Sequence, residues 1–133
     1  MTKKFKKILQ DAGLRHTRQR DKIASILFSG PPQHLSAEQL YEIVKNKSFK
    51  ISLATVYNSL RDFTKAGLLK EITIEPDRTW YDTCVECHHH FYNPNNNELL
   101  DIPSNSVDVS NLPKPPKGYK INSIDVIIRL NKK

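Results

Sequence analysis

The spacing of apolar residues predicts consecutive helices in the first half of the chain and strands after them. Helices are expected from near residue 2 to residue 12, from Thr17 as a cap to the segment SGPP, from residue 36 onward, and from residue 52 to Gly67. In the fourth helix, apolar side chains recur at steps of three and four, which predicts a buried face made of Leu53, Val56, Leu60 and Phe63.

Capping residues mark where these helices begin. Ser36 and Gln39 have the spacing of a capping box, and Leu35 and Leu40 occupy the two positions of a hydrophobic staple. Ser52 can cap the fourth helix in the same way. The third helix is therefore the best defined by the sequence.

Two β-rich runs, LLKEITI and TWYDT, follow the fourth helix. Pro76, Asp77 and Arg78 separate them, and residues of these types favour a turn between antiparallel strands. Helices followed by such a hairpin are typical of a winged helix-turn-helix domain.

The composition changes at about residue 84 to the segment NPNNNELLDIP, a proline-rich connection, and a β-branched segment INSIDVIIRLNKK. Two or three strands and little helix are expected there. So small a remnant needs a partner chain or a metal ion for stability. The sequence thus predicts an α+β fold with a winged helix-turn-helix domain and hinge over residues 1–83 and a second domain over residues 84–133.

Positive charge dominates the composition, since 21 Lys and Arg residues outnumber 14 Asp and Glu residues and the formal net charge is +7. This balance favours an anionic partner such as nucleic acid. No apolar run approaches the roughly 20 residues that span a bilayer, and the N-terminus lacks the apolar region of a secretory signal. The first helix is basic and amphipathic but too short to anchor firmly, so we expect a cytoplasmic protein that binds no membrane.

The exposed face of the fourth helix has side chains able to read DNA bases in a major groove. Thr55, Asn58 and Arg61 point away from the apolar face, and Tyr57 borders it. Arg61 can address guanine, Asn58 adenine, and Thr55 or Tyr57 a thymine methyl group. We include the capping Ser52 in this DNA-binding set; for Tyr57, the alternative is a partly buried position at the edge of the core.

Arg15, Arg18, Arg20 and Lys22 cluster at the start of the second helix, where cations oppose the helix dipole but fit phosphate oxygens or a minor groove. Their placement indicates a role beyond helix stability, and we assign the three arginines to DNA binding. The alternatives are a solvated charged face and a winged helix that binds only proteins.

The segment YDTCVECHHHFY has the residue types of a metal site. His88 and His90 alternate along an expected strand, so they project from one side of it, and Asp82 ends the preceding strand. A set of nitrogen and oxygen ligands suits Fe(II), Mn(II) or Zn(II). The alternative is a solvent-exposed turn that happens to contain histidines.

Two cysteines, Cys84 and Cys87, precede these histidines. In a reducing compartment such a pair is expected to serve as ligands or redox-active thiols rather than as a structural disulfide. The alternatives are two ordinary loop thiols and a thiol oxidoreductase, but the cysteines do not open a helix in a βαβ unit as that chemistry usually requires.

The chain resembles the Fur family of metal-responsive transcription regulators, and most closely its Irr-like and PerR-like branches. The resemblance rests on LRHTRQRDKI, HLSAEQLY, SLATVYNSLRDFTKAGLL and DTCVECHHHF, which stand in the family's order and spacing. It implies a winged-helix domain, a C-terminal α/β dimerisation domain, and a homodimer that binds a palindromic, A/T-rich double-stranded DNA operator.

The resemblance also implies one divalent metal ion per chain, Fe(II), Mn(II) or Zn(II), whose binding fixes the angle between the two domains. The implied ligands are His34, Asp82, His88, His90 and Asp101. A second implied group is haem or a further metal, for which Cys84, Cys87 and His89 are the candidate ligands.

The chain departs from the family at the structural zinc site. Asn93 and Asn96 stand where many members have a Cys-x-x-Cys pair, and no cysteine follows Cys87, so a four-thiolate zinc site within one chain is excluded. An auxiliary metal site of the family relies on a late histidine, and none follows His90.

The leading prediction is a metal-dependent DNA-binding repressor that responds to iron, peroxide or haem and is not an enzyme. The alternative is a small non-haem metalloenzyme or metal-storage protein, because histidine and carboxylate ligands also build oxygen-activating iron centres. No substrate-pocket motif or separate acid–base pair supports that alternative.

Overall fold

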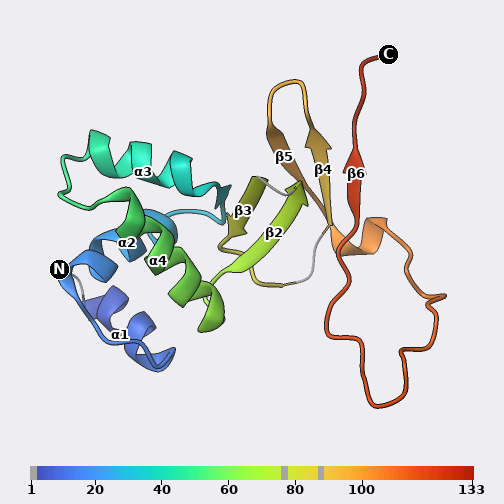
Figure 1. Ribbon diagram of the computed structural model, residues 1–133, viewed down its shortest axis with the longest axis horizontal. Helices are drawn as coiled ribbons and strands as arrows, with labels where there is room; N and C mark the ends of the chain where they lie inside the picture. Colours follow the sequence, from blue (N-terminus) through green and yellow to red (C-terminus); the bar gives the residue numbers. More distant parts are fainter. Residues whose placement is uncertain (1–2, 76–77, 87–88) are drawn as a thin grey trace. The chain divides into compact units, whose positions relative to one another are not determined.

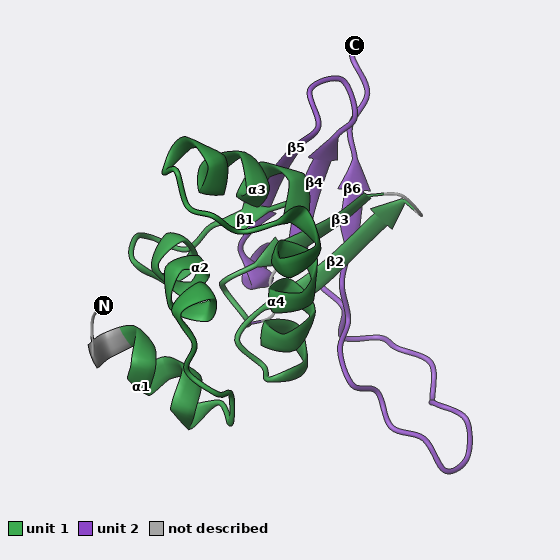
Figure 2. Ribbon diagram, turned by 60° about the vertical axis from the view of Figure 1, so that its left-hand side comes forward, with its two compact units in different colours: residues 1–85 green, residues 86–133 purple. Residues whose placement is uncertain are grey.

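The computed structural model describes residues 3–75, 78–86 and 89–133, and it divides into two compact units, residues 1–85 and residues 86–133 (Figure 2). Within these described residues, unit 1 contains four helices and a small sheet, and unit 2 contains a second small sheet. This arrangement confirms the predicted α+β fold class. Cys87, His88 and the turn residues Pro76 and Asp77 lie outside the described residues.

The helices of unit 1 follow one another along the chain as the apolar spacing predicts (Figure 1). They are α1 (Lys3–Asp11), α2 (Arg18–Phe28), α3 (Ala37–Asn46) and α4 (Leu53–Lys65). Across the described part of the chain, none of the helices combines the length and apolarity that crossing a membrane requires.

Each predicted cap is present in the structure. The Thr17 hydroxyl accepts from the Arg20 N–H and caps α2, and the Ser52 hydroxyl accepts from the Thr55 N–H and caps α4. Ser36 caps α3 in a full capping box with Gln39. These local hydrogen bonds satisfy N–H groups that the first turn of a helix leaves without intrahelical partners.

The apolar faces of the helices form the core of unit 1. Three of the four apolar positions predicted in α4 are fully buried: Val56, Leu60 and Phe63. Leu53 is 37% exposed, so its predicted burial is wrong. It is the first residue of α4, and the buried face begins only at Val56, one turn later. The Phe63 ring lies 6.1 Å from the Phe28 ring, which joins α4 to the end of α2.

The sheet of unit 1 has the strand order β1-β3-β2 and is antiparallel throughout. Strands β2 (Lys70–Glu75) and β3 (Arg78–Asp82) form the predicted hairpin, and their inward side chains, such as Ile72 and Trp80, are buried. Strand β1 (His34–Leu35) was not predicted. It has two residues, which is too short for an alternating pattern to reveal.

Unit 2 has the strand order β5-β4-β6. Strands β4 (His89–Asn93) and β5 (Glu98–Ile102) are antiparallel, and β6 (Ile127–Arg129) lies parallel to β4. Its helical content in the described residues is the 3-10 turn η1 (Ser104–Ser106). The expected C-terminal strand is thus present but short, because only three residues of its β-branched segment pair with β4.

Asparagines close the turn between β4 and β5. The Asn93 carbonyl oxygen Oδ1 accepts from the Asn95 N–H at 3.0 Å, and Asn96 Oδ1 accepts from the Glu98 N–H at 3.1 Å. Asn97 has a positive φ of 56°, a conformation that asparagine tolerates better than most residues. Asn93 and Asn96, which stand where many Fur-family members have cysteines, therefore stabilise this turn through hydrogen bonds.

Candidate functional site

Unit 1 places one histidine and one aspartate of the predicted metal set opposite each other. His34 on β1 is the cross-strand partner of Asp82 on β3. Two hydrogen bonds of 2.9 Å beyond this pair extend the strand pairing, one from the Thr83 N–H to the Gln33 carbonyl and one from the Gln33 N–H to the Thr83 hydroxyl. The register of β1 against β3 thus fixes the spacing of the histidine and the carboxylate.

The surroundings of this pair restrict both side chains. The His34 ring meets the Trp80 ring edge-on, with 6.0 Å between centroids. Asp82 is buried, and its Oδ1 accepts from the Cys84 N–H at 2.9 Å. A carboxylate that accepts a backbone hydrogen bond through one oxygen still has lone pairs for a further ligand.

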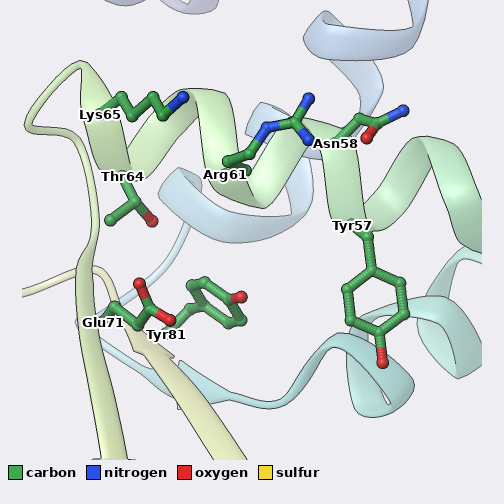
Figure 3. Close-up of a pocket in the computed structure, with 7 residues that line it drawn as sticks. All are labelled: Tyr57, Asn58, Arg61, Thr64, Lys65, Glu71 and Tyr81. Atoms are coloured by element: carbon green, nitrogen blue, oxygen red, sulfur yellow. The ribbon is translucent and has the colours of Figure 1, made fainter.

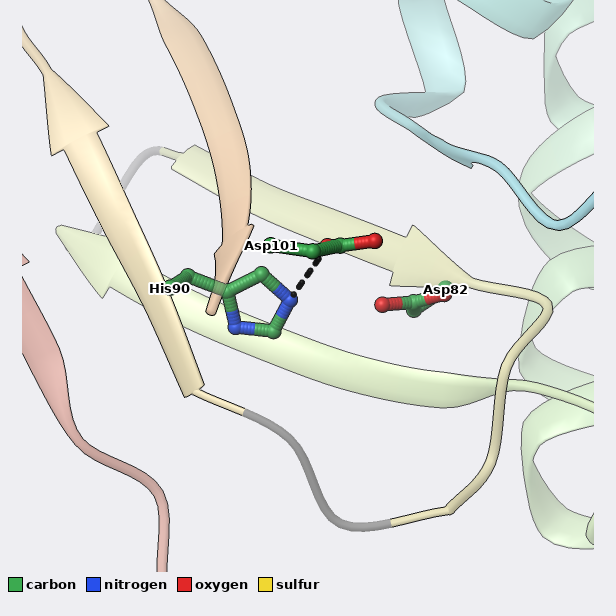
Figure 4. A group of neighbouring side chains, drawn as sticks. All are labelled: Asp82, His90 and Asp101. Atoms are coloured by element: carbon green, nitrogen blue, oxygen red, sulfur yellow. Dashed lines mark ion pairs between the residues drawn. The ribbon is translucent and has the colours of Figure 1, made fainter. Parts of the chain in front are cut away.

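Unit 2 contains a second cross-strand pair of the same composition. His90 on β4 lies opposite Asp101 on β5, and His90 Nε2 is 3.2 Å from Asp101 Oδ1 (Figure 4). The histidine is buried, whereas the aspartate side chain is 53% exposed. A backbone hydrogen bond of 3.1 Å from the His90 N–H to the Val126 carbonyl also holds this part of β4.

The atoms of the second pair fit a divalent metal ion. Imidazole nitrogen and carboxylate oxygen bind such ions at about 2.0–2.2 Å. Two ligand atoms 3.2 Å apart can both reach one ion at that range. The donor set suits Fe(II), Mn(II) and Zn(II), and it contains no thiolate that would select a softer ion.

The other candidates near the histidine cluster have different positions. His89 is buried, and its Nδ1 accepts from the Val126 N–H at 3.0 Å, which joins β4 to the segment before β6. Only its Nε2 could therefore bind haem or a second metal. Cys84 is a partly buried free thiol. Cys87 and His88 lie outside the described residues.

The predicted DNA-reading face of α4 is exposed in unit 1. Asn58 and Arg61 are exposed, Tyr57 is 43% exposed, and Thr55 is partly buried. Ser52 is exposed, but its hydroxyl also donates to the Thr55 hydroxyl, so both side chains are tied to the start of the helix.

A groove of about 330 Å³ runs between α4 and the hairpin (Figure 3). The helix side presents Arg61 and Lys65, and the strand side presents Glu71 and Tyr81, which are cross-strand partners. Burial, followed by the charge of Glu71, raises the pKa of Tyr81, so this hydroxyl keeps its proton. Because Arg61 and Lys65 lie on the helix side, that side of the groove is the positive one.

The three predicted arginines differ in their contacts. Arg15 and Arg18 are exposed. Arg20 pairs through its guanidinium with Asp62 of α4 at 3.1 Å and donates to the Arg15 carbonyl at 2.8 Å. Arg20 therefore joins α2 to α4, a role that its position in a basic cluster does not reveal.

Sequence reasoning missed one residue next to the predicted DNA-reading face. The Tyr57 hydroxyl donates a short hydrogen bond to the Glu38 carboxylate at the start of α3. This bond lowers the pKa of Glu38 and raises the pKa of Tyr57. No short-range sequence signal could have paired residues on two different helices.

Unit 1 is a winged helix-turn-helix with an exposed basic helix, and unit 2 contains a histidine–carboxylate pair. Together these features define a class of protein: DNA-binding regulators that respond to a metal ion. Comparison with known proteins identifies the family within that class. The model of the Ferric uptake regulator family matches residues 11–129, which is most of the chain. The chain belongs to this family of metal-responsive transcription regulators.

Two relatives illustrate the range of the match. The Peroxide operon regulator of Bacillus subtilis (strain 168) is 31% identical over 115 residues, covering 86% of this chain and 79% of the relative. A Ferric uptake regulation protein of Synechococcus elongatus is 32% identical over 102 residues, covering 74% of this chain and 69% of the relative. Both are named as regulators, which favours the predicted regulator over the alternative of a small metalloenzyme.

Solved structures share the fold. The ferric uptake regulator of Pseudomonas aeruginosa, solved with manganese, superposes with a TM-score of 0.75 at 23% identity and covers 97% of this chain and 98% of its own. The Vibrio cholerae regulator gives 0.73 at 24% identity, covering 95% and 98%. These likenesses confirm the predicted fold, with a winged-helix domain followed by a small C-terminal domain.

Proposed function

We propose that this regulator is a homodimer that represses transcription by binding a palindromic, A/T-rich operator when each chain holds one divalent metal ion. The proposed ligands combine the two cross-strand pairs with one further histidine: His34, Asp82, His88, His90 and Asp101. We expect the protein in the cytoplasm, together with the DNA that it binds.

The repetition of one His–Asp pair in each unit is the observation that supports this proposal most. His34 lies opposite Asp82 in the sheet of unit 1, and His90 lies opposite Asp101 in the sheet of unit 2. Both pairs belong to antiparallel strand pairings and have the donor types that Fe(II), Mn(II) and Zn(II) accept.

A metal ion bound by both units would link their relative position to metal concentration. A bound ion supplies the positive charge that offsets repulsion among carboxylates and holds imidazole nitrogens at fixed positions. If one arrangement of the units presents α4 better to DNA, metal and operator favour the same state and strengthen each other's binding.

The signal is proposed to be iron, peroxide or haem. Peroxide sensing through bound iron would leave an oxidised His34 or His88 in the protein released from DNA. Haem sensing would instead depend on Cys84, Cys87 and the Nε2 atom of His89. The two mechanisms thus predict different modified or liganded residues.

Adding metals and haem separately to the protein and measuring its binding to double-stranded DNA tests the proposed function. A pool of randomised duplexes would be enriched on the protein with Mn(II), Fe(II), Zn(II) or haem at two salt concentrations. We expect a divalent ion to tighten binding to an A/T-rich palindrome. Each phosphate neutralised adds roughly −0.9 to the slope of log affinity against log salt. Absence of any enriched duplex with every ion would contradict the proposal.

The contacts of Arg18 and Arg20 lead to a further prediction. Arg18→Ala should weaken binding to all sequences and reduce the salt slope by about one phosphate contact, without lowering the free energy of unfolding. Arg20→Ala should also destabilise unit 1, by about 1–2 kcal/mol, because it removes a partly buried pair with Asp62.

Urea unfolding beside salt-dependent DNA binding separates the two effects. Lys47→Ala is a control, because Lys47 is an exposed lysine at the C-terminal cap of α3 and lies far from Arg18 and Arg20 in the sequence. Equal unfolding free energies for the two arginine variants would refute a structural role for Arg20.

A further inference from the structure

The side chains of Glu38 and Tyr57 form a hydrogen-bonded pair next to the exposed face of α4. Tyr57 is 43% exposed on that face, and Glu38 is exposed in the first turn of α3. The tyrosine hydroxyl donates to Glu38 Oε1. The pair therefore belongs to the surface that is proposed to read DNA, and any role of the pair in base recognition rests on that proposed function.

Local structure holds Glu38 in place as an ionised acceptor. It follows the Ser36 cap by two residues, and negative charge is favourable near a helix N-terminus. The hydrogen bond from Tyr57 lowers the pKa of Glu38, so the carboxylate remains charged at neutral pH. The same bond is the main cause that raises the pKa of Tyr57, so its hydroxyl remains protonated.

A hydroxyl group has one proton to donate and two lone pairs that accept hydrogen bonds. Because the Tyr57 proton is directed at Glu38, only the lone pairs of the oxygen remain for other partners. Toward DNA, Tyr57 is consequently an acceptor with an apolar ring and is not a donor.

The bases of DNA differ in how they meet such an acceptor. In the major groove, guanine presents two acceptors, N7 and O6, and no donor. Adenine presents the N6 amino donor, cytosine the N4 amino donor, and thymine a methyl group that packs against an aromatic ring. An acceptor-only tyrosine is therefore compatible with three bases and places lone pairs against lone pairs at guanine.

We propose that Glu38 is a specificity-determining residue of the DNA-binding surface, which acts by holding the Tyr57 hydroxyl proton and so excludes guanine from the position that Tyr57 contacts. Glu38 is a positioning residue in this role, since its effect passes through Tyr57. Without the carboxylate, the hydroxyl proton is free to turn toward guanine N7 or O6.

Selection from a randomised duplex pool by the full-length, Mn(II)-loaded protein tests this role. Glu38→Ala should raise the guanine frequency at the Tyr57 position about threefold to tenfold, the effect of one hydrogen bond. Glu38→Gln removes the charge but keeps an acceptor oxygen, so it should retain most of the discrimination. Both variants should bind all sequences somewhat more tightly, because each removes a negative charge near phosphates.

The Tyr57→Phe background separates an effect through the tyrosine from a direct effect of the carboxylate. In that background, Glu38→Ala should leave the guanine frequency unchanged. Glu42→Ala is the matched control, because Glu42 is an exposed acid on the same helix and forms its ion pair with Lys45, one turn further along α3. It should leave the base preferences of the wild-type protein intact.

Two results would overturn the role of Glu38 while the proposed function stands. One is an unchanged guanine frequency in Glu38→Ala when the wild-type protein selects a defined sequence. The other is an equal rise in guanine with tyrosine or with phenylalanine at position 57. If the wild-type protein selects no sequence at all, the proposed DNA-binding function fails first, and this inference fails with it.

Discussion

Replacing Asp101 with alanine is expected to abolish most of the metal-dependent gain in DNA affinity while leaving the protein folded. Asp101 lies opposite His90 with 3.2 Å between their ligand atoms, and its side chain is 53% exposed, so its removal creates no cavity. Removing a side chain that only hydrogen-bonds to a metal ligand typically lowers metal affinity by about 10–100-fold. Removing a residue that binds the metal directly should lower the affinity at least as much. The midpoint of the Mn(II) titration of operator binding measures this shift.

Asp108→Ala is the matched control for this experiment. Asp108 is an exposed aspartate of the same unit, and its carboxylate accepts a hydrogen bond from the nearby Ser110 N–H. Its replacement removes the same charge outside the two pairs and should leave the titration midpoint in place. An unchanged midpoint in Asp101→Ala, or an equal shift in both variants, would contradict the proposed ligand set.

The metal-free proteins provide a second comparison. Since Asp101 is proposed to act only through the ion, the variant and the wild-type protein should bind DNA equally in the presence of a chelator. Circular dichroism spectra without metal should also coincide, and the free energy of unfolding should fall by no more than about 1 kcal/mol, because the pair lost with His90 has a half-exposed carboxylate. A larger loss of stability, or weaker DNA binding by the metal-free variant, would instead indicate that Asp101 mainly supports the fold of unit 2.

Local sequence signals predicted most of unit 1. The capping box at Ser36 and the cap at Ser52 are formed by residues three positions apart, so the sequence contains both partners of each hydrogen bond. The hairpin of β2 and β3 also depends on neighbouring residues. Elements whose determining contacts are close along the chain could therefore be predicted, with errors at their ends such as the exposed Leu53.

Contacts between distant residues could not be predicted in this way. Strand β1 exists because His34 and Leu35 pair with β3, almost fifty positions later, and nothing in two residues indicates that pairing. The same applies to the bond between Arg20 and Asp62, which lie 42 positions apart. An arginine cluster, or a lone histidine, therefore looks the same in the sequence whether it binds a partner or supports the fold.

Only part of the candidate metal site could be predicted from local sequence signals. The alternation around His90 indicated a ligand-rich strand, but the choice of Asp101 came from the resemblance to the Fur family. The structure gives this choice a physical basis within unit 2, because the β4–β5 register makes the two residues direct partners. The turn asparagines that fix this register, among them Asn93 and Asn96, are the residues that depart from the family's cysteines.

The second large effect is expected in the core beneath the predicted DNA-reading face. Leu60→Ala should lower the free energy of unfolding of unit 1 by about 2–5 kcal/mol, the usual cost of truncating a fully buried leucine. Leu60 has no exposed surface and lies on α4 between Asn58 and Arg61, so the same change should loosen the helix that presents them. Since a domain is stable by only about 5–15 kcal/mol, DNA affinity should fall as well.

Leu53→Ala provides an internal control with the same chemical change on the same helix. Leu53 is 37% exposed, so its truncation removes less buried area than Leu60→Ala and leaves no enclosed cavity, and it should cost only about 1 kcal/mol. Urea unfolding followed by tryptophan fluorescence, excited where tyrosine does not absorb, reports on unit 1, because the only tryptophan of the chain, Trp80, is buried in its sheet. Equal losses for the two variants would show that the exposed start of α4 is as important to the fold as its buried middle, and would refute the packing described for this helix.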